Sequence, residues 1–188
     1  MGVALFTTWT GACVLGQGSA SYIFRNHVAS GLYPIGVDAA VFDATGKPLS
    51  VADWRAELYG GLTANSLAPV ADEQTMALAI AVFTSPGYFN GGPDVVVNGV
   101  PEVGWAWLQV KVWNVELGTT FEEAASQNRG GYGQSSLFYA QGGGASVLQL
   151  PQPLIGLQSF TVLQVVPEPA TWGLLALGLG GLLWCRRG

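Results

Sequence analysis

The clearest strand of this sequence reads Trp105-Ala-Trp-Leu-Gln-Val-Lys-Val-Trp-Asn-Val115. Aliphatic side chains occupy every second position from Leu108 to Val112, and the positions between them carry aromatic or polar side chains. Successive side chains of a strand point to opposite faces of a sheet. The stretch therefore predicts a half-buried strand with one aliphatic core face and one face of tryptophan and polar residues, and it favours an all-β domain around it.

Two stretches on the N-terminal side of this strand support the same class. Residues 37–42 lead into a turn-forming cluster at 43–48, and residues 55–59 end at Gly60-Gly61, which predicts a hairpin or its equivalent. Residues 76–83 are apolar on both faces and stop at a Ser-Pro-Gly sequence. They predict a buried strand, with a short helix as the alternative.

The C-terminal half adds one short helix and two more strand candidates. Residues 121–126 predict a helical turn, because Thr119 and Thr120 precede it as N-cap candidates and two glutamates follow near its positive end. Residues 137–139 and 158–165 complete the strand candidates. About seven or eight short strands separated by turns predict a single β-sandwich, jelly-roll or immunoglobulin-like, over residues 21–166.

The composition argues against two classes of partner. Residues 21–166 contain five basic and eleven acidic side chains, a net charge of −6, and the basic ones do not cluster. Nucleic acids and anionic membrane surfaces are bound by clustered Lys and Arg, so neither is an expected partner of this domain. The 27 glycines of the chain are typical of a turn-rich extracellular β domain.

The expected domain carries no recognisable nucleophile or metal site. His27 is the only histidine, and we interpret it as a surface or partly packed side chain. The sequence contains no G-x-S-x-G elbow, and the Gly-rich context of Ser135 and Ser136 predicts a tight turn. Asp38 and Asp43 flank a strand but match no calcium loop, so turn capping is the expected role of Asp43. We therefore expect no cofactor and no metal.

Paired carboxylates are the other route to catalysis, here to glycan hydrolysis. Glu122 and Glu123 are adjacent and face different directions on a helix, so they do not form such a pair. Glu57, Glu116 and Asp94 are the candidates that the fold could bring together. Acidic residues are usually solvated surface groups, and we expect the protein not to be an enzyme.

The aromatic face of the strand at 105–115 is the candidate binding surface. Trp105, Trp107 and Trp113 share this face, and a row of rings on a half-exposed sheet can stack on sugar rings. The alternative is that most of these rings belong to the core. Exposed, contiguous aromatic side chains would favour binding instead.

The C-terminus combines three features in a fixed order. Pro167, Glu168 and Pro169 come first, and the two prolines hold the backbone extended. The apolar run from Thr171 to Cys185 follows, about 22 Å long as a helix against a hydrocarbon core of about 30 Å.

Two arginines, Arg186 and Arg187, come after the run and resist translocation, which predicts a cytoplasmic end and an exported body. The short run is a poor permanent anchor, so the prolines and Glu168 predict a processing site. An ordinary C-terminal membrane anchor is the alternative.

This tail, over about 23 of the 188 residues, resembles the PEP-CTERM sorting signal of Gram-negative bacteria, the substrate of the membrane protease-transpeptidase exosortase. The resemblance implies export, recognition of the Pro-Glu-Pro tripeptide at 167–169, and removal of the transmembrane helix. It further implies an inner-membrane intermediate and delivery to the cell surface or an exopolysaccharide matrix. It implies no particular activity for the body of the protein.

Residues 1–20 are expected to be a signal peptide that is cleaved after Ala20. No Lys or Arg precedes Arg25, so we expect this signal to be atypical or truncated. Lipidation of Cys13, as in a lipoprotein signal, is an alternative. The only two cysteines, Cys13 and Cys185, lie in the two segments expected to be removed. The mature domain is then expected to contain neither a disulfide nor a cysteine-based metal site.

Two functions from different classes follow from these features. The first is a non-catalytic surface or extracellular-matrix protein, sorted by exosortase and associated with exopolysaccharide or biofilm. The second is a carbohydrate-binding module that uses the tryptophan face. A glycan-active enzyme is the third and most distant alternative.

Overall fold

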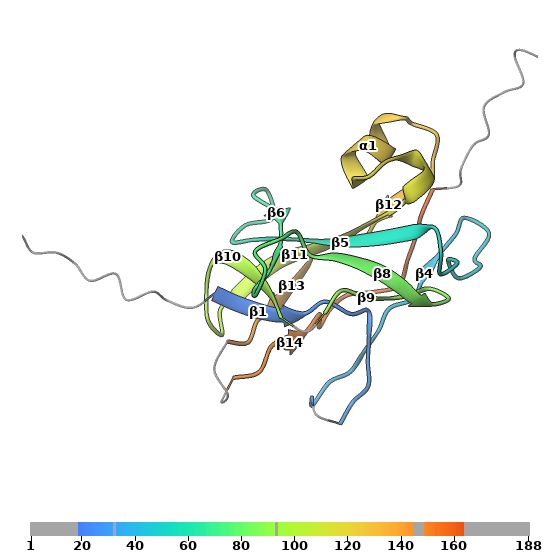
Figure 1. Ribbon diagram of the computed structural model, residues 1–188. Helices are drawn as coiled ribbons and strands as arrows, with labels where there is room; N and C mark the ends of the chain where they lie inside the picture. Colours follow the sequence, from blue (N-terminus) through green and yellow to red (C-terminus); the bar gives the residue numbers. More distant parts are fainter. Residues whose placement is uncertain (1–18, 32, 93, 145–148, 164–188) are drawn as a thin grey trace, which may run out of the picture.

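The computed structural model describes residues 19–31, 33–92, 94–144 and 149–163, which form an all-β structure with very little helix (Figure 1). The described residues form fifteen strands, more than the seven or eight predicted, and eight of them have three or more residues. These are β1 (Ser19–Ile23), β5 (Trp54–Gly61), β8 (Ile80–Ser85), β9 (Tyr88–Asn90), β10 (Val95–Pro101), β11 (Trp105–Asn114), β12 (Tyr132–Gln134) and β13 (Phe138–Gln141).

The remaining elements are short. The two-residue strands are β2 (His27–Val28), β3 (Val37–Asp38), β4 (Val41–Phe42), β6 (Ala68–Pro69), β7 (Ala71–Asp72), β14 (Gln152–Pro153) and β15 (Phe160–Thr161). The helical elements are the 3-10 helix η1 (Val115–Leu117) and the α-helix α1 (Phe121–Ser126).

Two sheets account for the main strands. The smaller sheet has the order β14-β1-β10-β7, and the larger has the order β12-β11-β5-β8-β9, with β13 also on β11 and β6 on β5. β4 pairs with β15 and β2 pairs with β3 outside these two sheets. In Figure 1, α1 lies on the opposite side of β5 and β11 from β1, where it contacts β11 and β12 and covers one end of the outer face of the larger sheet.

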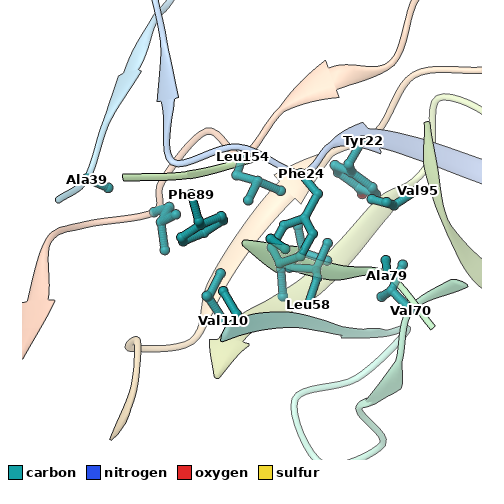
Figure 2. Close-up of a cluster of buried hydrophobic side chains, with 14 of the residues drawn as sticks. Tyr22, Phe24, Ala39, Leu58, Val70, Ala79, Phe89, Val95, Val110 and Leu154 are labelled. Carbon is teal, nitrogen blue, oxygen red and sulfur yellow. The ribbon is translucent and has the colours of Figure 1, made fainter. Parts of the chain in front are cut away.

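The main core lies between the two sheets. Figure 2 shows Leu58 of β5 and Val110 of β11 in one buried cluster with Tyr22 of β1 and Val95 of β10. The Tyr22 hydroxyl donates a hydrogen bond to the Ala140 carbonyl oxygen at 3.1 Å, which links β1 to β13 across the core. The aliphatic face of β11 therefore fills the sandwich interior, and its other face is left for the outer surface.

The strand and helix predictions around β11 are confirmed. β11 buries Ala106, Leu108, Val110 and Val112, so its period of two is the one read from the sequence. Helix α1 has the bounds predicted for the short helix, residues 121–126, and Thr120 is its N-cap.

The predicted hairpin between residues 37–42 and 55–59 is wrong. β4 pairs in parallel with β15, and β5 pairs with β6, β8 and β11. The turn at 43–48 does form, because the Asp43 carboxylate accepts hydrogen bonds from the backbone of Thr45 and Lys47. The chain reverses so tightly there that Phe42 bridges to Pro48, and β5 begins only afterwards.

The two-sided burial predicted for residues 76–83 is also wrong. Strand β8 begins at Ile80, and Ile80 and Val82 are exposed while Ala81 and Phe83 are buried. Only the Ala81 and Phe83 face meets the core, because the other face of β8 belongs to the outer surface of the larger sheet.

The N-terminal strand contains the predicted processing boundary. Ala20 is fully buried and pairs with Val97 of β10, so the junction between residues 20 and 21 falls inside β1. The signal peptide itself stays a prediction, because residues 1–18 lie outside the described residues.

Candidate functional site

Three aromatic side chains form a row on the outer face of the larger sheet. We call Trp105, Trp107 and Tyr139 the aromatic strip. The Trp105 and Tyr139 ring centroids are 5.2 Å apart with planes 23° from parallel, and the Trp107 and Tyr139 centroids are 5.1 Å apart. The side chains of Trp105 and Tyr139 are 49% and 51% exposed. The strip is therefore an open, contiguous aromatic surface.

Local strand geometry places the strip. β11 and β13 run antiparallel, with Trp107 opposite Tyr139 and Ala106 opposite Ala140. Because side chains alternate along both strands, the alanines enter the core and the aromatic rings all emerge on the outer face. Tyr139 is directly opposite Trp107 and diagonal to Trp105, which is opposite Gln141. Directly opposite and diagonal side chains of an antiparallel pair are both within reach of large rings, which explains the contacts of Tyr139 with the two tryptophans.

Trp113, the third tryptophan of the predicted surface, does not belong to the strip. It is 1% exposed and packs in a separate buried cluster with Leu117, Phe121 and Ala124. Its indole Nε1 donates a hydrogen bond to the Gly118 carbonyl oxygen at 3.2 Å. The chain after β11 folds back as η1 and α1 and covers this end of the strand, which the spacing of the tryptophans does not reveal.

Sequence reasoning missed Tyr139 as a member of the site. The sequence at 137–139 predicts only a strand, although its alternation of Phe138 and Tyr139 separates a buried ring from an exposed one. The pairing of β13 with β11 was the missing information, because it alone puts Tyr139 beside Trp105 and Trp107.

A polar cluster lies between the strip and α1. Lys111 of β11 forms an ion pair with Glu122 of α1, with Nζ and Oε1 3.1 Å apart, and the Tyr59 hydroxyl donates to the same oxygen at 2.7 Å. The Lys111 ammonium also lies 3.6 Å from the centroid of the Tyr59 ring. These contacts fasten α1 to the sheet, so the boundary between the open strip and the covered Trp113 is fixed.

The pKa values of two carboxyl groups in this cluster, Glu57 and Glu122, shift in opposite directions. Burial, together with the negative charge of Glu122, raises the pKa of Glu57, whose side chain is only 3% exposed. Burial acts in the same direction on Glu122, but hydrogen bonds from Tyr59 and Lys111 outweigh it and lower the pKa of Glu122. Burial and the hydrogen bond to Glu122 raise the pKa of the Tyr59 hydroxyl.

Glu57, Glu116 and Asp94, the three candidate catalytic carboxylates, have different neighbours and do not form one group. Glu57 interacts with Glu122, and Asp94 interacts with Glu73 on another part of the molecule. Glu116 lies in η1 and is exposed. Glu122 and Glu123 do face different partners, because the Glu123 carboxylate accepts hydrogen bonds from Thr119 instead.

The other residues considered for chemistry have structural contacts. Ser135 is buried, and its hydroxyl accepts from the Val110 amide and donates to the Ser136 carbonyl oxygen. Asp43 caps its turn, as predicted. His27 is on the surface beside Asp38, with Nδ1 and Oδ1 3.5 Å apart. Within the described residues, no group of three or more His, Cys, Asp or Glu side chains could hold a metal ion.

The predicted sorting residues lie outside the described residues. These are Pro167, Glu168 and Pro169, the run from Thr171 to Cys185, and Arg186 and Arg187. In the described part of the chain, no helix has the length and apolar character needed to cross a membrane.

Comparison with known families bears on this C-terminal segment. The structure defines an all-β domain, and residues 165–187, which follow it, match the family model of the PEP-CTERM protein-sorting motif. The predicted resemblance of the tail is confirmed. The motif implies an exported protein that is processed by exosortase and sorted to the cell surface. No curated protein and no solved structure matches the chain.

Proposed function

We propose that this protein is a non-catalytic component of the cell surface or extracellular matrix that associates with exopolysaccharide through the aromatic strip. The observation that carries the proposal is the open stack of Trp105 and Tyr139, with Trp107 beside it. The PEP-CTERM motif supports the surface location. A surface component without a glycan ligand is the competing interpretation.

The aromatic strip exposes flat apolar area to solvent. Two large rings that are about half exposed leave apolar surface in contact with water, which a binding partner with a flat apolar face can cover. Sugar rings present such faces, and their hydroxyl groups stay solvated at the edges. The three rings pack against one another, which restricts their rotamers, so little conformational entropy is lost when a ligand stacks on them.

The proposal predicts that removal of one ring weakens glycan binding without unfolding the domain. Full-length protein in non-ionic detergent is passed through gels that contain exopolysaccharide from the producing cells, and its retardation gives the affinity. Trp107→Ala is expected to bind about fivefold more weakly, since one aromatic contact contributes on the order of 1 kcal/mol. Trp105→Ala and Tyr139→Ala are expected to weaken binding in the same direction.

Val82→Ala is the matched control, because Val82 is an exposed apolar side chain on the outer face of the same sheet, two strands away from β11. It should be retarded like the wild type. Equal retardation of Trp107→Ala and wild type, or no retardation of the wild type itself, would contradict the proposal.

A further inference from the structure

A recess lies at the edge of the larger sheet, away from the aromatic strip. It is a cavity of about 380 Å³ between the segment that follows β1 and the hairpin of β8 and β9, and it is lined chiefly by Arg25, His27, Thr84, Ser85, Tyr88 and Asn90. The sheet order places β5 and β8 between β11 and β9, so this recess is separate from the strip. Its volume is in the range of small-ligand sites.

The walls of the recess are fixed by a buried asparagine. Asn26, between Arg25 and His27, is fully buried, and its amide nitrogen donates to the carbonyl oxygens of Ala39 and Gly87 at 2.8 and 2.9 Å. Its amide oxygen accepts from the Phe89 backbone at 2.8 Å. This residue ties the segment that carries Arg25 and His27 to the β8-β9 hairpin, so the recess is preformed.

Arg25 supplies a positive charge without a matching carboxylate. Its Nε donates to the Asn90 side-chain oxygen at 2.8 Å, and among the described residues it makes no ion pair. A guanidinium has five N–H donors, so four remain for a ligand while the amide of Asn90 holds the group in place. Arginine with free paired donors matches the geometry of carboxylate and phosphate oxygens.

Asp38 orients two other lining groups and does not itself line the recess. The Tyr88 hydroxyl donates to its carboxylate at 2.8 Å, His27 lies 3.5 Å from the same oxygen, and the His27 and Tyr88 rings meet edge to face at 5.3 Å. Among the described residues that line the recess, the charged or ionisable groups are Arg25, His27 and the Tyr88 phenol. Thr84 and Ser85 add two hydroxyl groups.

The lining carries the positive side chain of Arg25 in a domain that is acidic overall. The described residues contain eleven acidic and five basic side chains. Another recess, near the turn at 43–48, contains Lys47 together with Asp43, so its charges offset each other. None of the described residues that line the Arg25 recess is a carboxylate.

We propose that the Arg25 recess binds an oxyanion group of a small polar ligand, of which the carboxylate of a sugar acid is the form we expect. Arg25 pairs with the oxyanion, His27, Thr84 and Ser85 supply further hydrogen bonds, and the Tyr88 ring contacts the apolar face of the sugar. This site does not depend on the aromatic strip and would stand if the strip bound no glycan.

The test is a titration of the full-length protein in non-ionic detergent, in which the amide NMR signals of residues 88–90 report binding. Methyl glucuronide is the probe, methyl glucoside is the neutral sugar that lacks only the carboxylate, and inorganic phosphate is the oxyanion without a sugar. We expect saturable shifts with methyl glucuronide and at least tenfold weaker binding of methyl glucoside. Arg25→Gln should weaken methyl glucuronide binding about tenfold, and His27→Gln should weaken it in the same direction.

Lys47→Gln is the control, because it removes the same charge from a different recess. It should change the affinity less than twofold. Phosphate binding as tightly as methyl glucuronide would support an oxyanion site that the sugar ring does not strengthen, and weaker phosphate binding would support recognition of the whole sugar acid. Equal affinity for the neutral sugar, no saturable shift with any probe, or an equal loss in Lys47→Gln would overturn the proposal.

Discussion

Glu57 is the residue whose environment departs furthest from that of an ordinary surface carboxylate. It lies on the outer face of β5, opposite Lys111 of β11, and its side chain is closed off from water. Burial is the main cause of its raised pKa, and the charge of Glu122 adds to it. The folded protein therefore binds a proton at Glu57 more tightly than the unfolded chain does.

This binding difference predicts how the free energy of unfolding depends on pH. A raised pKa contributes stability that is fully present below the ordinary value of 4.5 and is lost as pH rises through the value in the folded state. Glu57→Gln has no proton to lose. Its free energy of unfolding is therefore expected to rise relative to wild type as pH increases above 4.5, as measured by urea unfolding at a series of pH values.

Glu116→Gln removes the same charge from an exposed position and is the control for the overall acidity of the domain. Its stability should follow that of the wild type across the series. A constant difference between Glu57→Gln and wild type from pH 4 to pH 8 would show that the folded state does not shift the titration of Glu57.

At the scale of elements, α1 separates the open part of β11 from the covered part. Its start is defined by Thr120, whose hydroxyl oxygen accepts from the Glu123 amide at 3.2 Å, and by Glu123, whose carboxylate accepts from the Thr119 amide at 2.7 Å. A helix of six residues has little stability of its own, so these capping bonds and the packing of Phe121 on Trp113 hold it.

Loss of the cap is expected to loosen α1. Thr120→Ala should lower the free energy of unfolding by about 1 kcal/mol. It should also speed hydrogen exchange of the amides in α1, which mass spectrometry of peptides from this segment detects. Thr120→Ser keeps the accepting oxygen and should behave like the wild type. A loss in Thr120→Ser as large as in Thr120→Ala would assign the effect to the methyl group of the threonine instead.

Elements with a local cause could be predicted from the sequence. The alternation in β11 and the threonines and glutamates of α1 act within a few residues, so the strand with its two faces and the helix with its cap are confirmed. The pairing of β5 with β11 and the exposure of Ile80 depend on contacts between distant segments. No pattern within 37–59 or 76–83 contains that information, and both predictions there are wrong.

The candidate site also contains residues that local sequence predicts and residues that depend on distant segments of the chain. The spacing of Trp105 and Trp107 predicts that they share a face, and they do. The burial of Trp113 and the addition of Tyr139 depend on α1 and β13, which come later in the chain. The Arg25 recess had no local signal, because β1 and the β8-β9 hairpin are about sixty residues apart in the sequence.

At the scale of the whole molecule, an all-β domain precedes a C-terminal sorting segment. The described residues end at Leu163, and the matched motif begins at position 165. The chain thus places its folded domain directly before the segment that exosortase is implied to process. The aromatic strip and the Arg25 recess belong to the domain and not to the segment, so processing would leave both on the released or displayed protein.

The most direct test of this account is the intact mass of the natural protein recovered separately from the cell-surface, culture and membrane fractions. The account predicts that the surface or culture form ends near Pro167, with or without an added group, and lacks Arg186 and Arg187. Mature protein found only in the membrane fraction, with Arg187 still present, would contradict it and establish a permanent anchor.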